Sequence, residues 1–406
     1  MSLPNTHSEI LTSLIARYFD IQDITWGTDQ QKFVVRYRGK LTQDSAKAYD
    51  QLAEALHRHN LTPLFRQEHE QDIILLMAGV VQPQPTNTRT NLVLFLLTLF
   101  SMLLAGAFYS YEGPPPDNEF ALYASLFRNL GSGWPFASSL LAILLAHEFG
   151  HYLAARHHHT PVTLPYFLPL PLLGGFGTLG AFIQLKAPPK NKNVLLDIGI
   201  AGPLAGLVIA IPVVLYGLSL SELGAIPLSF APGEGSMLEG NSILYLLSKY
   251  LVHGQLLPAP ISYQGVSPIL YWLRYYFTGL PAPLGGTDVF MHPIAWAGWA
   301  GLLVTALNLI PAGQLDGGHV LYVLFGKNAQ RIRPYILVTL MLLGMMYSGW
   351  WLWAAIIYFL GRQHAEPLDQ ITPLSPRRKI VAVLMLLVFI LVFTPVPLRI
   401  IGATGL

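Results

Sequence analysis

A membrane-length apolar run with two histidines at its centre constrains this chain more than any other feature. The run covers residues 137–156, ASSLLAILLAHEFGHYLAAR, about the 20 residues that a helix needs to cross the hydrocarbon layer. His147 and His151 are four residues apart, so a helix places both imidazoles on one face. Such a pair can hold a zinc ion, and Glu148 beside it can deprotonate a metal-bound water. Because ionisable groups at this depth are costly to insert, the cluster favours function over packing.

The composition indicates a membrane-embedded chain. Of its 406 residues, 52% are hydrophobic and only 11% are charged, whereas soluble domains carry about 25% charged residues. The formal net charge of +2 gives no sign of a nucleic-acid partner. There is no cysteine, so a zinc ion would have to be bound by His, Asp or Glu. The polar start MSLPNTHSEI does not look like a signal peptide, so we expect an internal span to direct insertion.

We expect a mainly α fold, a polytopic transmembrane helix bundle with a small N-terminal soluble α+β domain. The soluble domain takes residues 1–85, a linker 86–90, and the multi-span domain 91–400. The soluble part is predicted to hold two helices and three strands, with Asp44 near the cap of the second helix. Three histidines in this part are interpreted as surface residues, not as metal ligands: His57, His59 and His69. The sequence does not indicate the partner of this domain.

Apolar runs predict membrane spans at residues 91–111, 135–156, 194–218, 288–310 and 380–396. The run 334–360 is either one long helix or two short ones folded at Ser348–Gly349, and we favour the hairpin. Residues 157–192 contain too many Pro and Gly for one helix, so we expect a re-entrant segment or hairpin that lines a cavity. Within this segment GTLGAFIQLK can supply an edge strand that pairs with an extended peptide.

Basic residues predict the orientation of the chain. They lie before the first span, after the HEFGH helix and after the LDGGH sequence, at Arg89, Lys186, Lys190, Lys192, Lys327, Arg331 and Arg333. The loops 112–135 and 220–287 carry fewer basic residues. The N-terminus and the active site are therefore predicted to face the cytosol or its equivalent. Arg377, Arg378 and Lys379 reach that side only if 334–360 crosses twice, which is why we favour the hairpin.

Several other groups near the spans have two interpretations. Gly199, Gly202 and Gly206 let helices approach closely, which favours a packing role. Asp197 is either an interfacial residue, which we prefer, or a residue that orients a metal ligand. His157–His159 are interpreted as a polar helix end rather than an extra metal patch. NSILYLLSKYLVHG and PILYWLRYYFTG are expected to form amphipathic helices that lie at the surface or cover an entrance.

Asp316 is the candidate for a third zinc ligand. Catalytic zinc usually takes three protein ligands and a water, and Asp316 follows an apolar span on the side where HEFGH ends. Two imidazoles and one carboxylate leave a net charge of +1 on the metal, so the fourth position stays Lewis-acidic. The alternative is that Asp316 simply caps the helix that begins at Gly317.

The two motifs together resemble the site-2 protease family of intramembrane zinc metalloproteases. That family pairs HExxH with an Asn-x-x-Pro-x-x-x-x-Asp-Gly signature, and this chain has HEFGH and NLIPAGQLDGG, with Asn308, Pro311 and Asp316 in register. GIAGPLAG and HPIAWAGWAGLLVTALNLIP look similar to the branch found in cyanobacteria, other bacteria and plastids, without a PDZ-like insertion. The resemblance covers roughly residues 90–400.

The resemblance implies hydrolysis of peptide bonds in or near transmembrane segments of single-span membrane proteins. It assigns one Zn²⁺ per chain to His147, His151 and Asp316, and makes Glu148 the general base and then acid. Asn308 is expected to contact substrate or the developing oxyanion, or to pack as a helix amide. It also implies a multi-pass protein of the bacterial inner membrane or a plastid membrane. Two alternatives remain open at this point: a zinc hydrolase acting on lipid or prenylated substrates, and a zinc transporter or sensor.

Overall fold

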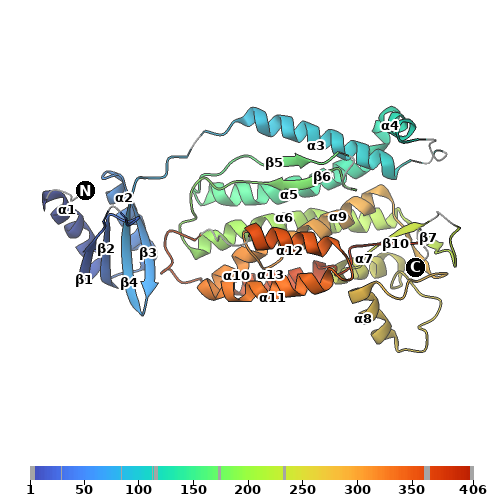
Figure 1. Cartoon of the computed structure of the whole chain (residues 1–406). Coiled ribbons are helices and arrows are strands. Elements are labelled where there is room, and N and C mark those ends of the chain that lie inside the picture. The colour runs from blue at the N-terminus through green and yellow to red at the C-terminus, as the bar shows by residue number, and fades with distance from the viewer. Residues whose placement is uncertain are drawn as a thin grey trace.

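A bundle of membrane helices and an N-terminal α+β region lie end to end in this chain (Figure 1). The structure is a computed structural model that describes residues 5–28, 30–83, 85–111, 113, 118–171, 175–231, 235–360 and 366–402. The helices of the bundle run roughly parallel to one another, and the α+β region sits at one end of them. We call that end of the bundle the near end and the opposite one the far end.

The N-terminal region is a four-stranded antiparallel sheet with two helices. The strands are β1 (Phe19–Trp26), β2 (Val35–Leu41), β3 (Leu61–Glu68) and β4 (Gln71–Ala78), in the order β1-β2-β4-β3, and the helices are α1 (Asn5–Ala16) and α2 (Ser45–His57). Asp44 caps α2, as predicted, because its side chain accepts a hydrogen bond from Lys47 N. The sequence prediction missed β1, whose burial does not alternate cleanly along the strand.

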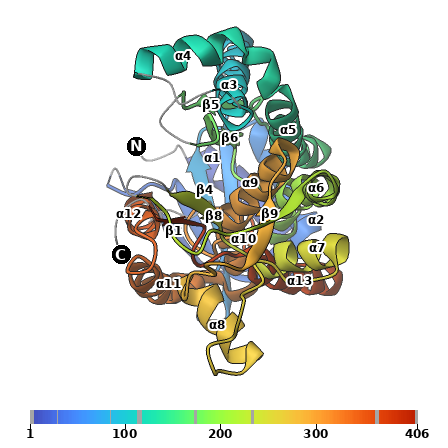
Figure 2. The ribbon, with the colours of Figure 1, turned by 90° about the vertical axis from the view of Figure 1, so that its right-hand side faces the viewer.

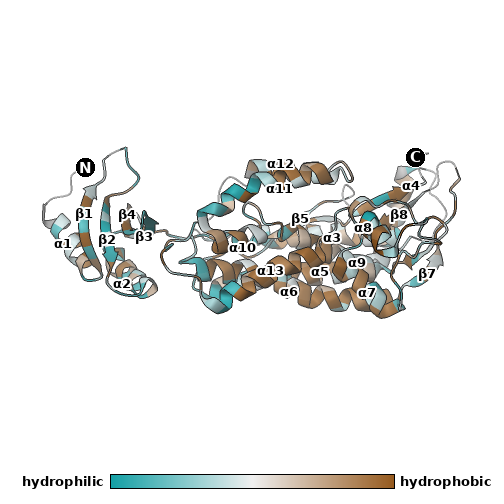
Figure 3. Cartoon of the chain, turned by 90° about the horizontal axis from the view of Figure 1, so that it is seen from below, coloured by the Kyte–Doolittle hydropathy of each residue, from teal (hydrophilic) through white to brown (hydrophobic). Residues whose placement is uncertain are grey.

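Among the described residues, three helical stretches are long and apolar enough to cross a membrane. They are α3 (Thr88–Tyr109), α5 (Trp134–His157) with the turn Leu130–Gly133 before it, and α6 (Lys192–Ser219). They match the predicted spans at 91–111, 135–156 and 194–218. α6 packs against α5 and against α9 (Pro293–Asn308), so α5, α6 and α9 form the centre of the bundle. Figure 3 shows this part predominantly in the hydrophobic colour, and the N-terminal region with many hydrophilic residues. The fold is therefore mainly helical with a small α+β region, as predicted.

The prediction of a span at 288–310 was wrong at its start. Residues Thr287–Phe290 form strand β9, which pairs with β7 (Glu222–Ala225), and α9 begins only at Pro293. Proline is favoured in the first turn of a helix, because its missing N–H needs no partner there. The last predicted span becomes α13 (Pro376–Val392), which likewise has a proline in its first turn.

The run 334–360 is a helical hairpin, as favoured from the sequence. Its two helices are α11 (Ala329–Leu343) and α12 (Gly349–Leu360), with residues 344–348 between them, and they contact each other. α10 (Asp316–Phe325) precedes them at the near end (Figure 1). Whether the hairpin crosses a membrane twice stays a prediction.

Short elements complete the bundle. The Pro- and Gly-containing segment after α5 folds as a two-stranded hairpin of β5 (Tyr166–Pro169) and β6 (Thr178–Phe182). The far end holds most of the others, seen face-on in Figure 2. They are α4 (Glu119–Arg128), β8 (Ser236–Glu239), α7 (Ile243–His253), α8 (Pro268–Thr278) and β10 (Leu398–Ile401). α7 and α8 are the two amphipathic segments expected from the sequence.

Residues 366–372, between α12 and α13, dock the N-terminal region onto the bundle. Phe65 N of β3 donates to Leu368 O, and Asp369 N donates to Lys190 O just before α6. Asp369 is fully buried and its carboxylate accepts hydrogen bonds from Ser45 Oγ at 3.0 and 3.1 Å. The segment therefore links the sheet edge directly to the start of α6.

Candidate metal centre

Helix α5 carries HEFGH in its second half, and all three ionisable residues of that motif are buried. The helix starts with Pro135 in its first turn and continues for 24 residues without a break. His147, Glu148 and His151 are 3%, 3% and 6% exposed, respectively. Their side chains meet the faces of α6 and α9 rather than open surface, because α5 packs against both helices.

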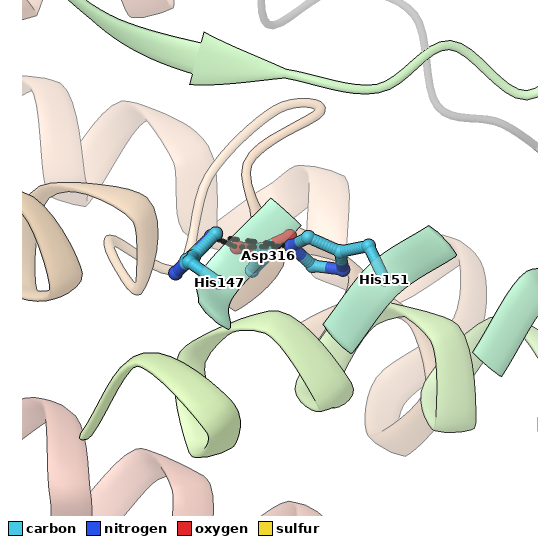
Figure 4. A group of neighbouring side chains, drawn as sticks. All are labelled: His147, His151 and Asp316. Atoms are coloured by element: carbon cyan, nitrogen blue, oxygen red, sulfur yellow. Dashed lines mark hydrogen bonds and ion pairs between the residues drawn. The ribbon is translucent and has the colours of Figure 1, made fainter. Parts of the chain in front are cut away.

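Asp316, at the first residue of α10, lies between the two imidazoles (Figure 4). Its Oδ2 atom is 3.4 Å from His147 Nε2 and 3.4 Å from His151 Nε2. The two Nε2 atoms are 3.2 Å apart. Leu315, not Asp316, is the N-cap residue of α10, so the cap interpretation of Asp316 does not describe its contacts.

The three side chains match the donor set that zinc requires. One ligand atom from each lies within 4.8 Å of the others, and this is the only such group found among the described residues. Zinc bonds imidazole nitrogen and carboxylate oxygen at about 2.0–2.2 Å, so one ion fits between three donors at these separations. In its neutral form each imidazole has one nitrogen lone pair, and the ionised carboxylate has lone pairs only. Together these groups suit the binding of a cation.

Helix α6 fixes the orientation of His151. The His151 Nδ1–H group donates to Ile198 O at 2.7 Å, so in the neutral ring Nε2 carries the lone pair that can bind a metal. Gly202, one turn further along α6, has no room for a side chain, because a Cβ atom there would overlap His151 Nε2. A Cβ atom at Gly206 would lie 3.3 Å from His147 Nδ1. These glycines bring α6 against the metal centre itself, a closer role than the packing expected from the sequence.

Glu148 faces the same small cavity as His147, His151 and Asp316. The cavity has a volume of about 220 Å³ and is bounded by α5, α6, α10 and the end of the β5–β6 hairpin. Glu148 Oε2 is buried and has no hydrogen-bond partner among the described residues. A buried carboxylate oxygen without a hydrogen bond lowers the stability of the fold. A water or a substrate group bound in the cavity would supply that hydrogen bond.

Two further residues contact this cavity. Asn308, a candidate from the sequence, has its Nδ2 atom 3.2 Å from His147 Nε2. His319 lines the cavity one turn after Asp316 and was missed, although the i, i+3 spacing in DGGH is the available signal.

Asp197 and His158, which follows the last residue of α5, form an ionic contact away from the His-His-Asp group. Asp197 accepts from Arg378 Nη2 at 2.6 Å and lies 2.9 Å from His158 Nε2. It therefore joins the end of α5 to the starts of α6 and α13, which neither sequence interpretation of Asp197 described. His57 and His69 are exposed, and no metal-binding group was found around them in the described part of the chain.

Taken together, the bundle and the buried His-His-Asp group define a membrane protein of the zinc metalloprotease class. The model of peptidase family M50 matches residues 135–347, more than half of the chain, and the chain belongs to this family. The match includes both motifs, so the resemblance to site-2 proteases is confirmed at the level of the family.

Three curated plant proteins are similar to this chain. The chain is 30% identical over 401 residues to the probable zinc metalloprotease EGY1, chloroplastic, of Oryza sativa subsp. japonica, covering 90% of this chain and 62% of the relative. It is 30% identical over 341 residues to the Arabidopsis thaliana protein of that name, covering 79% and 56%. It is 24% identical to the Arabidopsis thaliana probable zinc metalloprotease EGY2, chloroplastic, covering 99% and 67%. The chain thus spans about three fifths of the length of the first two relatives. No solved structure matches.

Proposed function

We propose that this chain hydrolyses peptide bonds in or near the transmembrane segments of single-span membrane proteins. His147, His151 and Asp316 hold one zinc ion, and Glu148 is the general base and then the general acid. The observation that carries the proposal is the meeting of Asp316 with two imidazoles of α5, 165 and 169 positions earlier in the chain. Such a meeting of lone-pair donors inside a helix bundle has no packing explanation.

The residues have separate tasks in this proposal. Bound zinc supplies a Lewis acid that polarises the scissile carbonyl and makes a water more acidic. The Glu148 carboxylate takes a proton from the attacking water and passes it to the nitrogen of the departing amine. Asn308 Nδ2 is an N–H donor beside His147, suited to the oxygen on which negative charge develops or to a substrate carbonyl.

Strand β6 is proposed as the place where the substrate lies. β6 pairs with β5 along one edge, and it has no second partner strand among the described residues. Phe182 at its end and Ile183 after it line the cavity that holds Glu148. A helical substrate hides its peptide bonds in its own hydrogen bonds, so it must extend before cleavage, and an extended segment can pair with a free strand edge.

The orientation follows from the same arrangement. The end of α5, the start of α6 and the start of α13 are on the near end, beside the N-terminal region (Figure 1). Lys192 is the first residue of α6, and Arg378 is in the first turn of α13. With the positive-inside rule, we propose that this end faces the cytosol of a bacterial cell or the corresponding side of a plastid membrane. The relatives named chloroplastic support a membrane of that kind.

Glu148→Gln tests the proposal against a protein that only binds zinc. The purified full chain should keep one zinc per chain by atomic spectroscopy, and cleavage of a single-span test substrate should fall at least a hundredfold. His157→Gln, a change of an exposed histidine on the same helix, is the control that should keep both. Unchanged cleavage by Glu148→Gln would remove Glu148 from the mechanism, and a zinc transporter or sensor would have no use for that carboxylate.

A further inference from the structure

A buried ionic cluster at the far end of the bundle contains more negative than positive groups. Lys249 of α7 is fully buried, and its Nζ atom is 2.7 Å from Glu239 Oε1 and 3.3 Å from Asp288 Oδ1. Glu239 and Asp288 are 4% and 3% exposed. Tyr245 donates its hydroxyl proton to Glu239 Oε1 at 3.1 Å. Two acidic side chains therefore share one ammonium group in a buried place.

Asp288 has an oxygen that nothing in this cluster satisfies. Its Oδ1 atom takes both protein contacts, from Lys249 Nζ and from Val289 N at 2.8 Å. Its Oδ2 atom is buried and has no hydrogen-bond partner among the described residues. Buried carboxylate oxygens normally accept hydrogen bonds, and an unsatisfied one is a reason to look for a missing donor.

Asp288 and Glu239 both line a pocket of about 330 Å³ between β8, β9 and the ends of α3 and α9. Aromatic side chains form much of its wall: Tyr109, Phe230, Phe290 and Trp296. Phe290 and Met237, which also line it, are 57% and 45% exposed, so the pocket reaches the surface of the molecule. Figure 2 looks onto this end of the bundle, with β8 and β9 towards the viewer.

We propose that this pocket binds an organic cation, a primary alkylammonium or a guanidinium group. Its N–H donors would supply the hydrogen bond that Asp288 Oδ2 lacks, and aromatic faces attract cations of this kind. A hard metal ion fits less well, because Ca²⁺ takes six or more oxygen ligands and Oδ1 of Asp288 and Oε1 of Glu239 already contact Lys249. The site is separate from the metal centre and does not depend on the peptidase activity.

The chemistry allows two sources, a free amine or the side chain of a lysine or arginine in another protein. Saturation-transfer NMR on the full chain in detergent micelles can measure binding of n-butylammonium and n-butylguanidinium. Both should bind saturably, and n-butanol and butyrate should not. Competition with n-butylammonium by a lysine-containing pentapeptide, compared with its glutamine analogue, distinguishes the two sources. Competition by the lysine peptide alone identifies a protein side chain as the ligand. Absence of competition by either peptide identifies a free amine.

Two variants test the assignment of residues. Asp288→Asn should weaken n-butylammonium binding at least tenfold, whereas Glu222→Gln, a nearby exposed carboxylate on β7, should not change it. Phe290→Leu lies on the surface, so it should fold normally and weaken binding about two- to fivefold. Phe120→Leu, an exposed phenylalanine outside the pocket, is its control.

Three results would overturn the proposal. The first is no saturable binding of either cation to the parent chain. The second is equal binding by the parent and by both Asp288→Asn and Phe290→Leu. The third is displacement of n-butylammonium by an equal concentration of potassium ions, which would show that the pocket selects charge alone.

Discussion

The described part of the bundle holds two largely shielded groups of three ionisable side chains, and they differ in the charges they contain. At the near end, two imidazole nitrogens and a carboxylate oxygen, from His147, His151 and Asp316, lie within 3.4 Å of one another. At the far end, Glu239 and Asp288 surround Lys249, which supplies a cation from the chain itself. The first group offers the ligand set of a metal ion once its imidazoles are neutral, whereas in the second a lysine already takes the place of a cation. Burial of charge alone thus does not indicate a metal site, because a permanent cation such as Lys249 can balance it.

Asp316→Ala should have the largest effect and should act on function, not on folding. Removing the only carboxylate of the ligand set leaves two imidazoles, so zinc content should drop below about one tenth per chain and cleavage should fall at least a thousandfold. Metal analysis and the single-span cleavage assay measure both. Asp23→Ala, an exposed carboxylate on β1, should retain both, and full zinc occupancy in Asp316→Ala would show that another residue is the third ligand.

Lys249→Met should have the opposite pattern. It leaves two buried carboxylates without their cation, which costs about 3–5 kcal/mol in the free energy of unfolding. Thermal unfolding in detergent should shift down strongly, yet the zinc content of the chains that remain folded should not change. Lys47→Met, on the exposed side of α2, is the control. Loss of zinc from folded Lys249→Met would mean that the two groups are coupled.

Gly202→Ala should have an intermediate effect confined to the metal centre. The added methyl group would overlap His151 Nε2, so the ring must move away from Asp316. We expect zinc affinity to fall about 10–100-fold, the usual range when the orientation of a ligand is disturbed. A competition titration with a zinc chelator measures this. Gly131→Ala, where the space around the new methyl group is open, should keep the parent affinity.

Ser45→Ala should have the smallest effect and should leave both buried groups unchanged. It removes the hydroxyl that donates to the buried Asp369 carboxylate, at a cost of about 1 kcal/mol. Hydrogen exchange of residues 366–372 should become faster, while zinc content and amine binding stay at the parent level. Ser13→Ala, exposed on α1, is the control; unchanged exchange at 366–372 would mean that Asp369 does not hold the N-terminal region.

The near-end group could be predicted from the sequence because its signals are local. The i, i+4 spacing fixes His147 and His151 on one helix face whatever the tertiary structure, and the placement of basic residues put Asp316 on the same side. Membrane helices such as α3 and α6 are similarly evident, because their length and apolar character are set by the bilayer.

The far-end group could not be predicted, because its members come from three short elements whose pairing is a tertiary property. Nothing local brings Glu239 of β8, Lys249 of α7 and Asp288 of β9 together. The same limit explains why the sequence predicts a span from residue 288 onwards: β9 is a strand only because β7 pairs with it. The docking of residues 366–372 on β3 is likewise a contact between distant segments.

X-ray absorption spectroscopy at the zinc edge of the purified parent chain tests the central claim most directly. We expect one zinc per chain with two imidazole nitrogens and oxygen ligands at about 2.0–2.2 Å, and loss of the signal in Asp316→Ala. A spectrum with three imidazoles, or an unchanged spectrum in Asp316→Ala, would contradict the claim that HEFGH and the LDGG aspartate share one ion.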